Sequence, residues 1–116
     1  MAKIAVLGYG VVGSGTVEVF YKNKESLEKK AGQEMDIKYI VPHQANQRII
    51  DFASVMLKVP KEKFYVNIDR YGNTSSASIP IALDEMNRKG MLQKGDLLLL
   101  PAFGGGLASA ACIVRW

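Results

Sequence analysis

Short apolar runs alternate with longer amphipathic stretches along the chain, and this alternation limits the fold more than any other feature of the sequence. The runs that predict β-strands lie at residues 3–7, 36–41, 64–69, 96–102 and 107–114. Between the first four runs, apolar residues recur at helical spacing over about residues 11–31, 45–58 and 77–89. In the second of these stretches, the expected inner face consists of Ile49, Phe52, Ala53, Met56 and Leu57. The order βαβαβαββ predicts an α/β fold of three layers, with helices on both faces of a five-stranded mixed sheet.

The last two predicted strands are joined differently from the others. Only a short glycine loop at residues 104–106 separates them, so the fifth strand is expected to run antiparallel to the fourth. The chain has 116 residues, which is the size of one domain. The sequence therefore predicts a single domain over residues 1–116, without an internal linker.

A glycine-rich turn at residues 8–13 follows the first predicted strand and precedes the first predicted helix. In this context Gly8, Gly10 and Gly13 fit a dinucleotide-binding turn, in which unpaired N–H groups at the helix start face a pyrophosphate. Such folds usually bind the ribose through an acidic residue at the end of the second strand, but residues 41–43 are not acidic. We expect no cofactor, because the glycines can simply shape the turn; weak binding of NAD(P) is the alternative.

The segment from Ile4 to Glu18 closely resembles the start of homoserine dehydrogenases, and the resemblance extends over residues 3–40. In that family the corresponding unit binds a nicotinamide dinucleotide, and a separate domain holds the amino-acid substrate. The resemblance implies an NAD(P)-dependent oxidoreductase as the source of this segment.

From residue 41 onward the chain resembles the C-terminal half of β-ketoacyl-[acyl-carrier-protein] synthase III, a condensing enzyme with a thiolase-like fold. Four separated motifs occur in that family's order, at residues 42–46 (PHQAN), 71–78 (YGNTSSAS), 104–106 (GGG) and 114–116 (VRW). The resemblance implies that His43 and Asn73 donate hydrogen bonds to a thioester oxygen, on which negative charge builds during decarboxylative condensation. It also implies that a backbone N–H in the glycine loop, that of Gly105, stabilises the second oxyanion.

The cysteine nucleophile of that family lies in its N-terminal half, and the one cysteine of this chain does not fit the role. Cys112 stands in the middle of a predicted apolar strand, where a thiol acts as a small inert hydrophobic group. Without a thiolate the covalent step fails. We therefore expect His43, Asn73 and Gly105 to be vestigial, and the two side chains to serve as turn and cap residues.

Together the two resemblances predict a chimera, an engineered or recombined scaffold without catalytic turnover. Two alternatives remain: a weak NAD(P)-binding module, and a fragment of a β-ketoacyl synthase III that needs a partner chain for its cysteine. A dinucleotide-binding unit sets its first two strands side by side, which would give the strand order 3-2-1-4-5. The thiolase-like order 3-2-4-5-1 is favoured because residues 41–116 are the larger block.

Charge and residue counts limit the partners. The net charge is +4, but basic residues do not gather in a block with interleaved aromatics, so we expect no nucleic acid to bind. One histidine and one cysteine exclude the common zinc sites, and no apolar run is long enough to predict a membrane span. Half of a condensing enzyme exposes an apolar helix face or sheet edge, so we expect a homodimer. The expected location is the cytoplasm, a reducing compartment.

Overall fold

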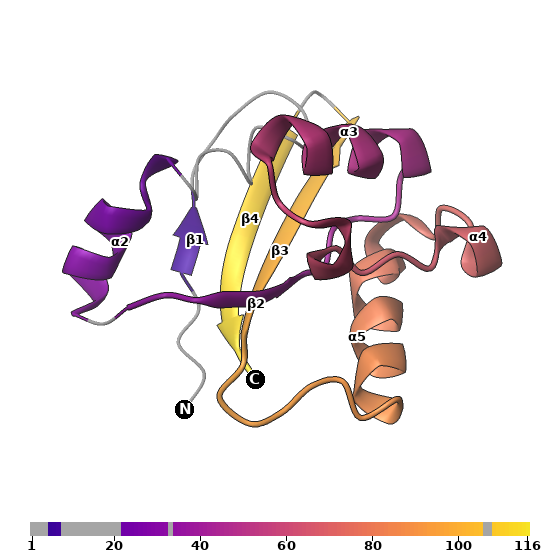
Figure 1. The fold of residues 1–116 in the computed structure, drawn as a ribbon. Helices are drawn as coiled ribbons and strands as arrows, with labels where there is room; N and C mark the ends of the chain where they lie inside the picture. Colours follow the sequence, from indigo (N-terminus) through magenta and orange to yellow (C-terminus); the bar gives the residue numbers. More distant parts are fainter. Residues whose placement is uncertain (1–4, 8–21, 33, 106–107) are drawn as a thin grey trace.

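The computed structural model describes residues 5–7, 22–32, 34–105 and 108–116, and Figure 1 shows how they are arranged. The strands and helices follow in the order β1 (Ala5–Leu7), α2 (Lys24–Ala31), β2 (Ile37–Ile40), α3 (Gln47–Leu57), α4 (Ile68–Tyr71), α5 (Ser78–Arg88), β3 (Leu97–Gly104) and β4 (Ala108–Arg115). Two short 3-10 helices, Lys61–Lys63 and Ser75–Ala77, lie in the connections.

The strands of the described residues form one sheet in the order β1-β4-β3-β2. β2 runs parallel to β3, and the long hairpin of β3 and β4 pairs antiparallel from Leu97 opposite Arg115 to Gly104 opposite Ala108. β1 closes the far edge, antiparallel to β4. Apart from the third predicted strand, the favoured strand order and the antiparallel last strand are confirmed, and the alternative order, which sets β1 beside β2, is excluded.

The third predicted strand is wrong, so the described sheet has four strands and not five. At its position beside β2, Phe64 makes a single parallel bridge to Ile40, and the next N–H, of Tyr65, donates to Ile40 O at 2.9 Å. The ladder ends there because the side chain of Gln44 takes the place of a neighbouring strand. Gln44 Nε2 donates to Tyr65 O at 3.1 Å, and Gln44 Oε1 accepts from Asn67 N–H at 3.0 Å.

α2 corresponds to the end of the first predicted helix, and it stops at Gly32 as expected. Gly32 has φ 66° and ψ 21°, a left-handed conformation that glycine adopts without strain. Residues 8–21, which hold the rest of that predicted helix and the glycine-rich turn, lie outside the described residues.

α3 packs on the sheet with only part of the face expected from its apolar pattern, and Ala53 is buried as predicted. Ile50 and Ser54 are buried, whereas Phe52 and Met56, which we expected to face inward, are 58% and 61% exposed. Ser54 is tolerated inside because its hydroxyl donates to Val59 O at 2.7 Å. A polar residue with a local acceptor thus lies on the inner face, and two apolar residues of the predicted inner face lie outside it.

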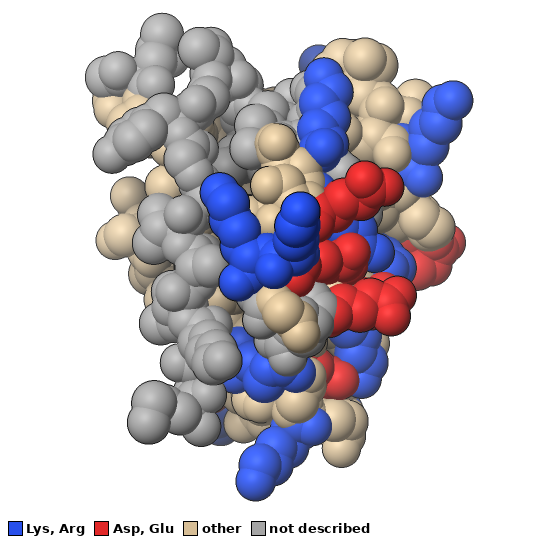
Figure 2. Space-filling model, turned by 90° about the vertical axis from the view of Figure 1, so that its left-hand side faces the viewer, with Lys and Arg blue, Asp and Glu red and all other residues tan. Residues whose placement is uncertain are grey.

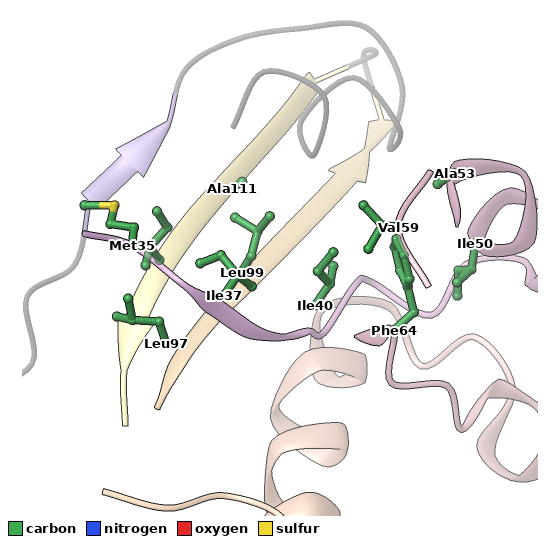
Figure 3. Packing of buried hydrophobic residues seen from close by; sticks show 11 residues of the cluster. Met35, Ile37, Ile40, Ile50, Ala53, Val59, Phe64, Leu97, Leu99 and Ala111 are labelled. Carbon is green, nitrogen blue, oxygen red and sulfur yellow. The ribbon is translucent and has the colours of Figure 1, made fainter. Parts of the chain in front are cut away.

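Two apolar clusters hold helices to opposite faces of the sheet. The first fills the space between the sheet, α3 and the segment after α3 (Figure 3). Leu27 of α2 packs against this cluster. Its buried members are Met35, Ile37, Ile40, Ile50, Ala53, Val59, Phe64, Leu97, Leu99, Ala111 and Ile113. The second lies under α5 and contains Val41, Tyr65, Ala82, Met86, Leu92, Leu98 and Leu100. Neighbours in β3 alternate between the two clusters, as in a strand covered on both faces.

Charged side chains of both signs lie next to one another on the side of the molecule that carries α2 (Figure 2). Within α2, Lys24 Nζ lies 3.5 Å from Glu28 Oε1. On β2, Lys38 Nζ lies 2.8 Å from Asp96 Oδ2. Exposed pairs of this kind add little to stability, so the packing described above holds the fold together. Among the described residues, no helix is long and apolar enough to cross a bilayer.

Candidate functional site

His43 is placed by an extension of β2 beyond its last paired residue. Val41 N–H donates to Leu99 O and His43 N–H donates to Pro101 O, both at 2.8 Å, so this segment still runs beside β3. Asn46 then caps α3, accepting from the backbone N–H of the second helical residue at 2.8 Å. His43 therefore lies at the carboxyl end of the parallel strands, where open α/β sheets place their ligand sites.

Two contacts hold the ring of His43. Its Nδ1 lies 2.6 Å from Ser78 Oγ, at the start of α5. Phe103 of β3 meets the ring edge to face, with 5.7 Å between centroids and an angle of 71°. In the described part of the chain, the other ring nitrogen, Nε2, has no hydrogen-bond partner. The ring is thus fixed on one side and available on the other.

Asn73 lies in the loop between α4 and α5. Its Oδ1 accepts from Ser75 N–H at 2.9 Å, a turn that asparagine favours. Gly72 has φ 68° and ψ −163°, a conformation that is almost restricted to glycine, and Ser75 has φ 55°. The carbonyl oxygen of Asn73 is therefore engaged, and its Nδ2 amide remains as a donor without a partner among the described residues.

His43 and Asn73 line the same open hollow at the carboxyl end of β3. The other lining residues are Ser75, Ser76, Ser78, Ile79, Ala102, Phe103 and Gly104. His43 and Phe103 also line a smaller apolar pocket, with about 360 Å³ of empty volume, between α3 and the sheet. The hollow is thus lined by an amide donor, that of Asn73, and by an imidazole whose Nε2 is available, beside apolar and hydroxyl groups.

The other site residues that the sequence suggested are glycines, and the structure describes one of them, Gly105. Gly105 is exposed, and its neighbour Gly104, not Gly105 itself, contributes to the lining. Gly8, Gly10 and Gly13 lie outside the described residues. Within the described part of the chain, His, Cys, Asp and Glu side chains form no group that could hold a metal ion.

Cys112 lies in β4, half-buried beside the cluster under α5. Burial raises the pKa of its thiol. The thiolate is the nucleophilic form of cysteine, so a raised pKa makes Cys112 less reactive near pH 7. Its environment agrees with a packing role.

Two polar residues of the site were missed by the sequence analysis, although both stand inside the quoted motifs. Ser78 is 2% exposed and lies between the His43 ring and the backbone of Gln44, whose N–H donates to Ser78 Oγ at 3.3 Å. Gln44 is 1% exposed, and its side-chain amide joins the segment after β2 to the segment before α4. Apart from a bond of Gln44 to Pro42 O, these contacts join residues 21 to 35 positions apart, so the local sequence pattern does not reveal them.

Glu85 links α5 to α4, the two helices on either side of the loop that carries Asn73. Its carboxylate accepts from Lys89 Nζ at 2.6 Å, from Asn67 Nδ2 at 3.0 Å and from Arg70. These donors, with Lys89 contributing most, lower the pKa of Glu85 to about 2. The network therefore holds both ends of the segment that carries Asn73.

Replacing Glu85 by glutamine is expected to destabilise the chain by about 1–2 kcal/mol near pH 7, and by less in acid. The pKa of Glu85 falls from 4.5 to about 2 on folding, so between these values the unfolded chain binds more protons. The stabilisation is thus present above pH 4.5 and is lost as the pH falls through about 2. Urea unfolding of both proteins across this range measures the difference, and a difference that does not shrink in acid would contradict the prediction.

The control for this experiment is Asp84→Asn, on the same helix. Asp84 is exposed and pairs only with Arg88, at 2.8 Å, among the contacts of the described residues. Its removal is expected to change the free energy of unfolding by no more than about 0.5 kcal/mol.

Comparison with known proteins places these residues in a family. The family model described as 3-Oxoacyl-[acyl-carrier-protein (ACP)] synthase III C terminal matches residues 27–116. A β-ketoacyl-[acyl-carrier-protein] synthase III from Clostridium novyi is 60% identical over 90 residues, which make up 78% of this chain and 28% of the relative. The protein of the same name from Clostridium tetani is 50% identical over 101 residues, or 86% of this chain and 30% of the relative. The chain thus spans less than a third of the length of these relatives.

Solved structures agree with the sequence matches. The 3-oxoacyl-[acyl-carrier-protein] synthase III of Aquifex aeolicus VF5 superposes with a TM-score of 0.71 at 36% identity, over 99% of this chain and 43% of that one. The synthase III of Thermus thermophilus gives a TM-score of 0.73 at 35% identity, over 97% of this chain and 45% of that one. These matches support a thiolase-like α/β fragment, as the strand order predicts.

The same matches overturn the interpretation of the chain as a chimeric scaffold without turnover. The family match begins at residue 27, within the segment assigned to a dehydrogenase, and the synthase structures cover nearly the whole chain. The boundary at residue 40 is therefore wrong, and no comparison supports a homoserine dehydrogenase segment. An engineered origin has no support either, and the relatives are condensing enzymes, so the prediction of a non-enzyme is wrong.

Proposed function

The chain belongs to the 3-oxoacyl-[acyl-carrier-protein] synthase III family, and we propose that it supplies the oxyanion-binding half of a condensing active site. One observation carries the proposal: His43 and Asn73 line the same hollow, and each has one polar atom engaged by the protein and one nitrogen, able to donate, without a partner in the described residues. Two such donors suit an oxygen on which negative charge develops.

The proposed step is decarboxylative condensation of thioesters. Loss of carbon dioxide from a β-carboxyl thioester leaves an enolate, whose negative charge rests on the thioester oxygen. His43 Nε2–H and Asn73 Nδ2–H donate to that oxygen, and the enolate carbon then attacks an acyl group held on a cysteine. The new carbon–carbon bond replaces the carbon–sulfur bond, and the thiolate leaves. Each donor of this kind is worth about a hundred- to thousandfold in rate.

The cysteine that carries the acyl group comes from outside these 116 residues, either from the same polypeptide or from a second one. Cys112 is the only cysteine of the chain, it does not line the hollow, and burial raises the pKa of its thiol. The hollow is also open, whereas hydrogen bonds to an oxyanion are strongest when water is excluded. A second half that carries the cysteine would close the hollow as well.

The surface around α5 is suited to such a second half. Ile79, Leu83, Met91 and Val114 are partly buried against the cluster under α5 and leave apolar surface exposed. An enzyme half that packs there would remove this surface from water, at about 25 cal/mol per Å². When no such half is present, we expect a second copy of the chain to take its place, which gives a homodimer in sedimentation experiments.

Complementation tests the proposed function. The chain is mixed with the cysteine-bearing N-terminal half of a related synthase III, and formation of a β-ketoacyl product is followed. We expect product that depends on both halves, that disappears when the partner's cysteine is changed to alanine, and that persists with Cys112→Ser in this chain. A stable complex of the two halves without product would contradict the proposal.

A further inference from the structure

We propose that Ser78 is a positioning residue: its hydroxyl donates to His43 Nδ1 and so keeps the ring proton on Nε2. The inference rests on the proposed function only for its catalytic consequence, in which Nε2–H is the donor to the oxyanion. The proton position itself follows from the contacts of three described residues, and it can be measured without any activity.

The direction of the bond follows from what surrounds the hydroxyl. Ser78 is 2% exposed, and its Oγ has two polar neighbours among the described contacts: His43 Nδ1 at 2.6 Å and the backbone nitrogen of Gln44 at 3.3 Å. The backbone N–H can only donate, so it donates to Oγ. A buried hydroxyl also needs an acceptor for its own proton, and Nδ1 is the acceptor within reach. The serine proton therefore points to His43.

The tautomer of the ring follows from this direction. A nitrogen that accepts a hydrogen bond carries no proton, and a neutral imidazole keeps its single proton on the other nitrogen. The bonds therefore run one way, from Gln44 N–H to Ser78 Oγ and from Ser78 O–H to His43 Nδ1, which leaves Nε2–H as the outward donor. Phe103 contacts the ring edge to face, so its tilt is restrained as well.

The chain offers a direct test, because His43 is its only histidine. Long-range proton–nitrogen correlation spectra of the 116-residue chain, recorded at about pH 8.5 where free imidazole is neutral, report the state of each ring nitrogen. We expect a pyridine-type shift for Nδ1 and a pyrrole-type shift for Nε2. A pyrrole-type Nδ1 would overturn the proposal, whatever the variants do.

Variants show whether the serine hydroxyl is the cause. With Ser78→Ala, we expect the two nitrogen shifts to move toward each other as the tautomers mix; with Ser78→Thr, which keeps a hydroxyl, we expect the original pattern. The control is Ser54→Ala, which removes a different buried hydroxyl, bonded to Val59 O, and is expected to leave the ring unchanged. An unchanged spectrum in folded Ser78→Ala would reject Ser78 as the cause. If that variant does not fold, the spectrum of the unaltered chain still shows which ring nitrogen carries the proton.

The complementation assay separates this inference from the proposed function. In that assay Ser78→Ala is expected to lower kcat about ten- to hundredfold, as removal of a histidine's supporting partner does elsewhere, with rescue by Ser78→Thr. Should the unaltered chain give no product at all, the proposed function fails while the spectra still test the tautomer. Full activity of Ser78→Ala in a working assay would reject the positioning role.

Discussion

Replacing Gln44 by alanine is expected to lower the free energy of unfolding by about 3–5 kcal/mol. The side-chain amide donates to Pro42 O at 2.9 Å and to Tyr65 O at 3.1 Å, and it accepts from Asn67 N–H at 3.0 Å. All of these residues are buried, and Gln44 and Asn67 are both 1% exposed. The variant leaves backbone groups without partners in a place that water does not reach, and each such group costs about 1–3 kcal/mol.

Guanidinium unfolding followed by circular dichroism measures this loss, and the m-value shows whether unfolding stays two-state. The matched control is Gln47→Ala. Among the described residues the amide of this exposed glutamine bonds to Asp51 alone, at 3.2 Å, so we expect the free energy of unfolding to change by less than about 0.5 kcal/mol. A Gln44→Glu variant keeps the size but replaces two N–H donors with oxygen, and it should be at least as unstable at neutral pH. A loss below about 1 kcal/mol for Gln44→Ala would mean that the amide is not needed where the third strand ends.

Replacing Asn73 by aspartate is expected to lower kcat in the complemented enzyme by at least about a hundred- to thousandfold. Aspartate retains the Oδ1 atom that accepts from Ser75 N–H, so the turn is kept. It loses the N–H donor and brings a negative charge close to the developing oxyanion. Asn73 is exposed, so the stability of the fold should hardly change.

This variant distinguishes two possible roles of the Asn73 side chain, which are to stabilise the loop and to donate a hydrogen bond from Nδ2. If the side chain only stabilised the loop, aspartate would support near-normal activity and alanine would not. If Nδ2 is a donor, both variants lose activity, aspartate at least as much as alanine because of its charge, and the unfolding free energies change little because the side chain is exposed. Parallel measurement of kcat and of chemical unfolding for the two variants distinguishes these outcomes, and an active Asn73→Asp enzyme would remove Asn73 from the proposed mechanism.

The arrangement of the sheet followed largely from the order of the elements. Alternating strands and helices, a short last loop and the thiolase-like motifs together gave the position of β1 beside β4, which the register of Val6 opposite Cys112 bears out. The third strand could not be excluded in the same way. It ends because the Gln44 side chain reaches Tyr65, 21 residues further along, and a pattern of apolar residues carries no information on such a contact.

Two other errors have the same origin in local pattern. The apolar spacing of α3 put Phe52 and Met56 inside, because it could not show that Ser54 has a backbone acceptor in Val59. The glycine-rich turn suggested a dehydrogenase up to residue 40, although the family match already begins at residue 27. His43 and Asn73 were found from their motifs, whereas the hydroxyl of Ser78 needed the fold, since it lies 35 residues from the ring that it contacts.

The amide of Gln44 stands next in sequence to His43, and this adjacency has a consequence for mutational surveys. A substitution at position 44 keeps the backbone N–H that donates to Ser78. Loss of the side-chain amide would, however, disturb the backbone next to His43 and so reach the ring indirectly. A screen that reads turnover alone would then rank Gln44 with the reacting groups, although it meets no substrate. Only a paired readout of folded fraction and rate would assign it to the framework.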